Sequence, residues 1–294
     1  MKGWLGWTLL GAVALTVLQV VIGGLLVPAT PAPPGVVPWW LLSNLLVAAV
    51  AARLARRSRA SRPLRMAMLF LVLFGIPANY LAEAFIFDIG ASRPMVLRWY
   101  LQDLIVGAGV AALLGWPRAA QAAAARPAGR AAGAWLARIG AGVVAYIVAY
   151  ITAGLAIYPW ISDHYIGRRM PGFPVIVLMQ VFRGLGFLGV AWAIVRLTEG
   201  TRSQAAVRVG VTLSIVGGVA PLIVPNAYLP DVVRHAHIVE VGVSNFLFGL
   251  FAGWLLAPPP SSAETEHGRF AAWQAEEKPD ASIQFASARP SDMQ

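Results

Sequence analysis

Apolar residues follow one another along most of this chain in runs of about 20, the length at which an α-helix spans a hydrocarbon core roughly 30 Å thick. Short segments that hold most of the charged residues separate these runs. The pattern therefore predicts an all-α polytopic membrane protein. Its eight transmembrane helices are expected at residues 4–27, 38–55, 65–87, 98–116, 135–158, 174–196, 208–226 and 234–257.

The composition supports this interpretation. Hydrophobic residues make up 58% of the chain and charged residues only 12%, whereas a soluble domain carries about 25% charged residues. The chain has no cysteine, which excludes disulfides and thiolate chemistry. The first apolar run follows Lys2 and also has features of a signal peptide. Its length and its counterpart later in the chain favour a retained helix.

Arginine marks one side of the predicted bundle. The segments after the second, fourth and sixth predicted helices are rich in arginine, and Lys2 and the C-terminal tail add further positive charge on the same side. The positive-inside rule therefore places the N- and C-termini in the cytoplasm. The net charge of +10 is explained as a topology signal. Membrane lipids, and not nucleic acid, are the expected partners. The other side holds only Arg93, Arg98, Arg168, Arg169 and Arg234.

The chain reads as two parallel four-helix repeats. Polar and special residues recur at corresponding places in the two halves, and an even number of spans makes both halves point the same way. We expect a first repeat at 1–116, an Ala/Arg-rich cytoplasmic linker at 117–134, a second repeat at 135–257 and a disordered cytoplasmic tail at 258–294. The matched pairs are Gln19 with Tyr150, Gly23 with Gly154, Pro28 with Pro159, Pro38 with Pro174, Asn44 with Gln180, and Arg98 with Arg234.

The last predicted helix carries a polar stripe. Its polar residues fall on one side when successive residues are placed about 100° apart. A one-sided polar stripe in a membrane helix faces protein or water, because a charge at the bilayer centre costs about 2.5–3.5 kcal/mol on insertion scales. Partners for the stripe are therefore expected on other helices. The stripe consists of Arg234, His237, Glu240, Ser244 and Asn245.

Candidate partners lie at similar depth in the other helices, in the half of the membrane opposite the arginine-rich side. We predict that they and the stripe converge on one outward-facing polar cavity that binds a ligand. His237 and Glu240 are the candidates for a catalytic role. The other predicted ligand-binding residues are Asn44, Asn79, Glu83, Asp103, Gln180 and Arg183, with Ser43, Asp88 and Gln102 nearby.

Each of these features has a structural alternative. Arg183 with Glu83 or Glu240 can form a buried ion pair that only fixes helix packing. The amides of Asn44, Gln180 and Asn245 can serve as hydrogen-bonding glue between helices. His237 and Glu240 share a helix face and could ligate a metal with Glu83 or Asp103, and a histidine pair could hold haem. The sequence predicts no metal or cofactor, because the first repeat has no histidine.

Two stretches resemble an uncharacterised family of bacterial eight-span membrane proteins: QVFRG at 180–184 and VPNAYLPDVVRHAHIVEVGVSNFLFG at 224–249. The resemblance implies eight spans in the bacterial cytoplasmic (inner) membrane and no particular activity. The positions that carry it are Gln180, Arg183, Gly184, Pro225, Asn226, Pro230, Val233, Arg234, His237, Glu240, Ser244 and Asn245.

Three functions stay open at this point. The chain can bind or transport a small polar or anionic molecule or a lipid headgroup. Alternatively, it can be an intramembrane enzyme that acts on a lipid-like substrate, with Glu240, or His237 oriented by Glu240, as acid or base. It can also be a structural subunit of a membrane complex. The sequence contains no zinc-protease helix, nucleophile elbow, P-loop or dinucleotide fingerprint, and it identifies neither the ligand nor the oligomeric state.

Overall fold

The computed structural model of the chain describes residues 2–27, 33–87, 91–116, 132–168 and 170–258. Within these ranges the regular structure is helical, and 8 helical segments are long and apolar enough to cross a membrane. The chain is therefore an all-α polytopic membrane protein, as predicted. Most of the predicted linker and tail, together with Asp88 and Arg169, lies outside the described residues.

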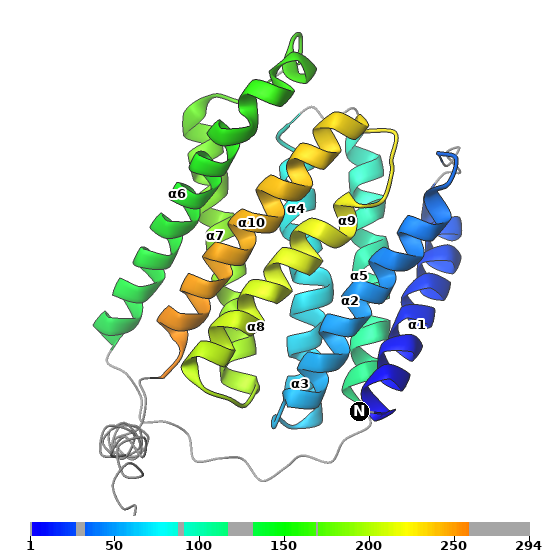
Figure 1. Cartoon of the computed structure of the whole chain (residues 1–294), viewed down its shortest axis with the longest axis vertical. Coiled ribbons are helices and arrows are strands. Elements are labelled where there is room, and N and C mark those ends of the chain that lie inside the picture. The colour runs from blue at the N-terminus through cyan, green and yellow to red at the C-terminus, as the bar shows by residue number, and fades with distance from the viewer. Residues whose placement is uncertain (1, 28–32, 88–90, 117–131, 169, 259–294) are drawn as a thin grey trace, which may run out of the picture. The chain divides into compact units, whose positions relative to one another are not determined.

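The spans follow one another as a bundle of helices (Figure 1). Two of them are composite, because a short π-helical segment interrupts the α-helix. In order, the spans are α1 (Lys2–Leu26), α2 (Val36–Arg57), α3 (Arg62–Phe70) with η1 (Leu71–Gly75) and α4 (Ile76–Ala84), α5 (Arg93–Gly115), α6 (Ala132–Tyr165), α7 (Phe173–Leu197), α8 (Arg202–Ser214) with η2 (Ile215–Val219) and α9 (Ala220–Leu222), and α10 (Asp231–Leu256).

Two predicted boundaries are wrong by six residues or more. Helix α6 continues to Tyr165, beyond the predicted end at residue 158, and Pro159 lies inside it. Helix α8 begins at Arg202, before the predicted start at residue 208. Its start is fixed by a capping box in which the Thr201 side chain accepts from the Gln204 backbone N–H and the Gln204 side chain accepts from the Thr201 N–H. Hydropathy marks only the apolar part of a helix and misses such polar ends.

The π-helical segments η1 and η2 occupy corresponding places in the third and seventh spans. Each is followed after one residue by a proline, Pro77 in α4 and Pro221 in α9. Proline has no backbone N–H and crowds the turn before it, which favours a widened turn there. In both spans the part of the helix after the proline is therefore set at a different rotation from the part before the π-helical segment.

Other contacts recur in the two halves of the chain. Helix α1 packs against α2 and α5, and α6 packs in the same way against α7 and α10. The guanidinium of Arg62 lies 5.6 Å from the ring centroid of Trp116. The guanidinium of Arg202 lies 3.6 Å from the ring centroid of Trp254. These cation–π contacts join the start of the third span to the end of the fourth, and the start of the seventh to the end of the eighth.

Helices α8 and α10 approach each other most closely through small residues. A Cβ placed on Gly249 would lie 2.6 Å from the Cα of Gly210, and one placed on Gly253 would lie 2.6 Å from the Cα of Ala206. Small residues let the backbones of membrane helices approach closely. In lipid, where the hydrophobic effect does not drive helices together, the van der Waals contacts of this close packing stabilise the pair. This contact holds α10, which carries the polar stripe, in a fixed rotation.

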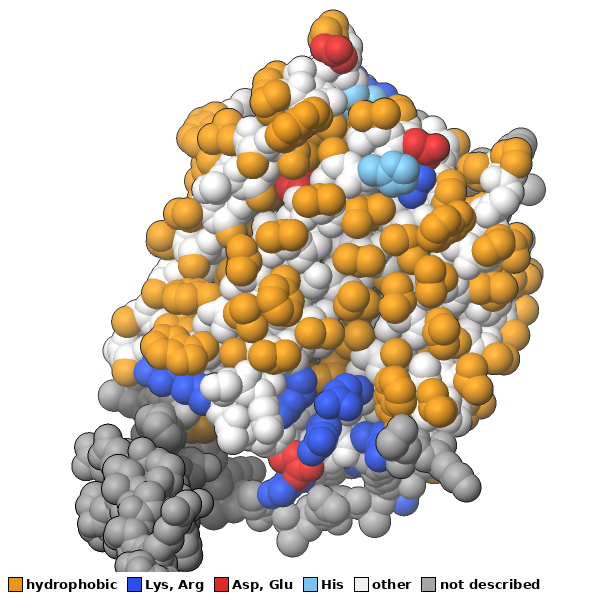
Figure 2. All heavy atoms as spheres, viewed as in Figure 1, with side chains coloured by type: hydrophobic (Ala, Val, Ile, Leu, Met, Phe, Trp, Pro, Cys, Tyr) orange, Lys and Arg blue, Asp and Glu red, His pale blue; other side chains and the backbone are white. Residues whose placement is uncertain are grey.

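The surface agrees with a protein embedded in lipid. Figure 2 shows apolar side chains along the whole middle of the visible face, with arginine and lysine gathered at the end where α3 and α8 begin. Histidine and most of the acidic side chains on this face lie toward the opposite end. The charged groups therefore border an apolar band.

Candidate functional site

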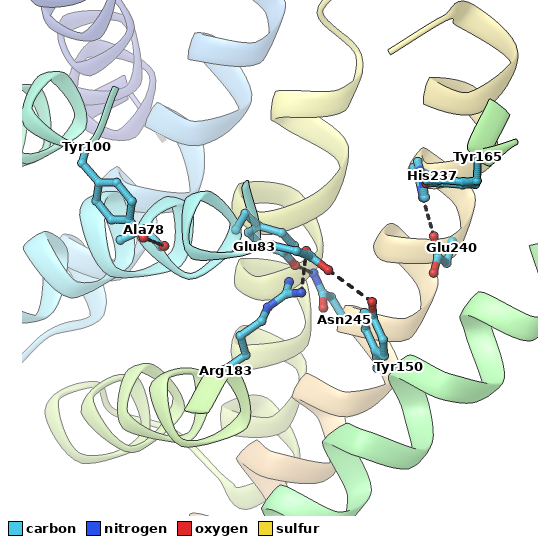
Figure 3. A network of polar contacts seen from close by, with 10 residues as sticks. Ala78, Glu83, Tyr100, Tyr150, Tyr165, Arg183, His237, Glu240 and Asn245 are labelled. Carbon is cyan, nitrogen blue, oxygen red and sulfur yellow. Dashed lines mark hydrogen bonds and ion pairs between the residues drawn. The ribbon is translucent and has the colours of Figure 1, made fainter. Parts of the chain in front are cut away.

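The candidate site centres on Arg183, which α7 places inside the bundle with only 3% of the residue exposed. Its Nη1 donates to Oε2 of Glu83 in α4 at 2.6 Å (Figure 3). The Glu83 side chain is 25% exposed, so the carboxylate end of the pair is open and the guanidinium end is closed. Of the two partners predicted for Arg183, the structure shows Glu83.

Aromatic rings surround the guanidinium of Arg183. Its central carbon lies 4.6 Å from the ring centroid of Tyr80, and Tyr146, Tyr150 and Phe187 lie slightly farther away, up to 6.0 Å. Such rings stabilise a buried cation through their negative faces. The Tyr150 hydroxyl donates to Oε1 of Glu83 at 3.2 Å, so both carboxylate oxygens have a donor. The ion pair is thus held rigidly from three helices.

Asn245 connects this group to α10. Its amide nitrogen donates to the hydroxyl of Tyr80 and to the backbone carbonyl of Leu213 at 3.3 Å. Tyr80 in turn faces Arg183. The structure therefore brings Glu83, Arg183 and Asn245 together through Tyr80, with contributions from α4, α7, α8 and α10.

A second group lies along α10 and α6. The Nδ1 of His237 is 2.5 Å from Oε2 of Glu240, and its Nε2 is 3.2 Å from the Tyr165 hydroxyl (Figure 3). With a proton on Nδ1, the imidazole donates to the carboxylate and accepts from the tyrosine. Gly154 of α6 lies beside Glu240, and a Cβ there would be in ordinary van der Waals contact with Oε1, at 3.7 Å. Tyr165, His237 and Glu240 thus form a continuous chain of hydrogen bonds.

Arg234 contacts the backbone at the end of the preceding span. Its Nη1 donates to the carbonyls of Leu222 at 3.0 Å and Ile223 at 3.2 Å, and its Nη2 donates to Asp231 at 2.6 Å. These carbonyls end α9 and have no partner within the helix. Arg234 therefore closes the end of α9 and joins it to the start of α10.

Asn44 also lies apart from the ion pair. Its amide nitrogen donates to Thr16 at 3.0 Å and to Gln19 at 2.9 Å, and the Trp40 indole donates to the same Gln19 oxygen at 2.9 Å. These bonds join α1 to α2. In the structure Asn44 acts as the hydrogen-bonding glue that was the structural alternative for this residue.

The remaining predicted residues form no hydrogen bond or ion pair with one another among the described residues. Gln180 is completely buried on α7. Asn79 of α4 lies against Gly186 of α7, where an added Cβ would collide with the Asn79 side-chain amide. Asp103 and Ser244 are half-buried. The candidates thus lie in several separate groups.

In the part of the chain that the structure describes, no three His, Asp or Glu residues are placed to hold a metal ion. A cavity of about 460 Å³ opens elsewhere, between η1, α4 and α5. None of the predicted site residues lines it. Its walls are apolar apart from one tyrosine, and they are formed by Phe74, Phe85, Leu97, Tyr100, Leu101 and Leu104.

Sequence reasoning missed the tyrosines of the site. Tyr80, Tyr146 and Tyr165 were not predicted, and Tyr150 was noted only as the counterpart of Gln19. Tyr146 and Tyr150 are four residues apart and therefore share a helix face. A pair of tyrosines on one face of a membrane helix, away from its ends, is a signal that could have pointed to a buried cation.

Comparison with known proteins adds no assignment. No protein-family model, no curated protein and no solved structure matches this chain. What the site can do must therefore be argued from its own geometry.

Proposed function

We propose that this chain binds a small polar or anionic molecule, or a lipid headgroup, at the Glu83–Arg183 pair and carries it across the membrane. The observation that supports this most strongly is a guanidinium buried to 3% exposure and paired with a carboxylate that is 25% exposed. Ionisable residues inside membrane bundles mark substrate or ion pathways.

The pair also joins the two halves of the chain. Glu83 belongs to the first proposed repeat, and Arg183 with Tyr146 and Tyr150 belongs to the second. Transporters built from repeats bind their substrates at the interface between the repeats. The matched packing of α1 and α6, the two π-helical segments and the two Arg–Trp contacts support a duplicated four-helix unit.

The proposed membrane is the bacterial cytoplasmic (inner) membrane, with both termini in the cytoplasm. Helix α3 begins at the arginine-rich end and α4 ends at Ala84, next to Glu83. In this orientation Glu83 lies near the extracytoplasmic surface. A ligand would then reach the open carboxylate from outside the cell.

Ligand-dependent stability tests the proposal. A panel of small carboxylates, phosphates, amides and lipid headgroups is added to the purified protein, and the midpoint of thermal unfolding, Tm, is measured. At least one compound should raise the Tm of the wild type and of Arg202→Met, a control at the arginine-rich end, but not that of Arg183→Lys or Glu83→Gln. Uptake of that compound into proteoliposomes should show the same dependence. If no compound raises the Tm, or all variants respond equally, the proposal is wrong.

The His237–Glu240 pair favours a second candidate, an intramembrane enzyme acting on a lipid-like substrate. The 2.5 Å contact orients the imidazole, as a carboxylate orients a histidine in acid–base catalysis. Turnover of membrane lipids by the purified protein, lost in His237→Gln and Glu240→Gln, would support the enzyme. The third candidate, a structural subunit, predicts a stably co-purifying complex that tolerates all of these changes.

A further inference from the structure

Gln180 stands out among the buried polar residues. Its exposure is 0%, and neither its Nε2 nor its Oε1 has a hydrogen-bond partner among the described residues. A buried amide without partners is destabilising, because it has lost its hydrogen bonds to water and gained none. Such a group in a folded protein calls for a specific reason.

The corresponding residue in the first half has the partners that Gln180 lacks. Asn44 is 2% exposed, and its amide donates to Gln19 and Thr16 of α1. The counterpart of Gln19 is Tyr150, whose hydroxyl donates instead to Glu83. In the second half, the partner that the repeat provides is therefore used by the Glu83–Arg183 pair, and the Gln180 amide is left to bind something else.

Arg183 offers a further unused donor next to Gln180. Its Nε has no partner among the described residues, although its Nη1 is bound to Glu83. Residues three apart share a helix face, and a helical side chain leans toward the N-terminus of its helix. The side chain of Arg183 therefore leans over the turn that carries Gln180. Together they present the donors Nε and Nε2 and the acceptor Oε1.

We infer that Gln180 and Arg183 Nε form the subsite that binds an uncharged polar group of the ligand, a primary carboxamide or an un-ionised carboxyl group. Such a group has an acceptor oxygen next to a donor, which matches two donors and one acceptor. Glu83 already balances the charge of Arg183. An additional buried anion would have no counter-charge there, so a neutral group costs less to bring in. This inference rests on the proposed function and specifies the ligand's chemistry.

Acetamide and acetate test the inference, since they have nearly the same shape and differ in charge. Acetamide at a concentration well above its dissociation constant should raise the Tm of the wild-type protein by about 2 °C or more. Acetate should raise it by less than half as much. Gln180→Met, which keeps the length of the side chain and removes its polar atoms, should abolish the acetamide effect. The inference fails if acetamide has no effect, or if Gln180→Met responds as the wild type does.

Stability without ligand gives an independent readout with a matched variant. Gln180→Met should leave the Tm unchanged or raise it, because it removes unpartnered groups. Asn44→Leu should lower the Tm, because it removes the donor of Thr16 and one of the two donors of Gln19. If Gln180→Met and the smaller change Gln180→Ser both lower the Tm as far as Asn44→Leu does, Gln180 has partners within the protein and the inference is wrong. If other ligands still protect the wild type but not Arg183→Lys, the proposed function stands without this subsite.

Discussion

Ser58 and Thr198 face each other across the arginine-rich end of the bundle in a single antiparallel bridge. The residues that flank them exchange backbone hydrogen bonds, from Arg59 N–H to the Leu197 carbonyl at 3.3 Å and from Glu199 N–H to the Arg57 carbonyl at 3.0 Å. The loop after the second span thus pairs with the loop after the sixth by reciprocal contacts. Such reciprocal contacts are expected if the two proposed repeats are related by a twofold axis.

Gly200 should be the most sensitive residue of this loop pair. Its φ of 133° is a conformation that other residues rarely adopt, and a Cβ would collide with the Arg208 guanidinium and lie 2.5 Å from Gln204 Oε1. Gln204 belongs to the capping box of α8. We expect Gly200→Ala to lower the free energy of unfolding by about 1–2 kcal/mol. Denaturant unfolding in micelles measures this.

Gly189→Ala is the matched control for that change. Gly189 lies in α7, and a Cβ added to it would meet nothing within 4 Å, so alanine should be neutral or slightly stabilising there. Equal losses of stability in the two variants would contradict the role given to the Gly200 backbone.

The Glu83–Arg183 pair predicts non-additive mutations. Arg183→Met should lower the free energy of unfolding by about 3–5 kcal/mol, because it leaves a carboxylate facing a ring of tyrosines without its cation. Glu83→Met should cost at least as much, since it leaves the guanidinium of Arg183, only 3% exposed, without its counter-charge. The double variant should be more stable than Arg183→Met alone. Unfolding measurements on the four proteins complete the cycle, and additive effects would mean that the two side chains do not interact.

The contact between α8 and α10 predicts a strong effect of size at Gly253. Valine there would collide with the backbone of Ala206, which is 2.6 Å from the position of a Cβ, and would push α10 away from α8. We expect Gly253→Val to lower the Tm sharply and to weaken any ligand effect that depends on α10. Gly24→Val in α1, where a Cβ would meet nothing within 4 Å, should change the Tm little. Thermal unfolding of both variants decides the matter.

Because the chain has no cysteine, single cysteines can report its orientation. Ser61 precedes α3 at the arginine-rich end, and Ala227 lies between α9 and α10 at the other end; both are exposed. In intact cells a membrane-impermeant maleimide should label Ala227→Cys but not Ser61→Cys, which should react only after lysis. The reverse labelling would place the termini outside the cytoplasm.

The sequence was sufficient for the eight spans and for a buried Arg183 paired with one of two acids, Glu83 or Glu240. A long apolar run is stable in lipid as a helix, because a helix satisfies its own backbone hydrogen bonds. A buried arginine such as Arg183 needs an acidic partner nearby. The sequence did not show that Arg234 binds the carbonyls at the end of α9. Every residue has a backbone carbonyl, so no particular side chain in the sequence marks such a partner. Nor did it show that Tyr150 turns to Glu83 when Gln19, its counterpart, turns to Asn44.

The π-helical turn η1 has a consequence for how Glu83 reaches its partner. A π turn holds one residue more than the α-helical turn it replaces, and each residue of a helix advances by about 100°. Winding Leu71–Gly75 as an ordinary α-helical turn, with no residue removed, would swing everything beyond it, Tyr80 and Glu83 included, by roughly that angle away from Arg183. One widened turn in an apolar span is thus enough to aim an acid into the protein interior.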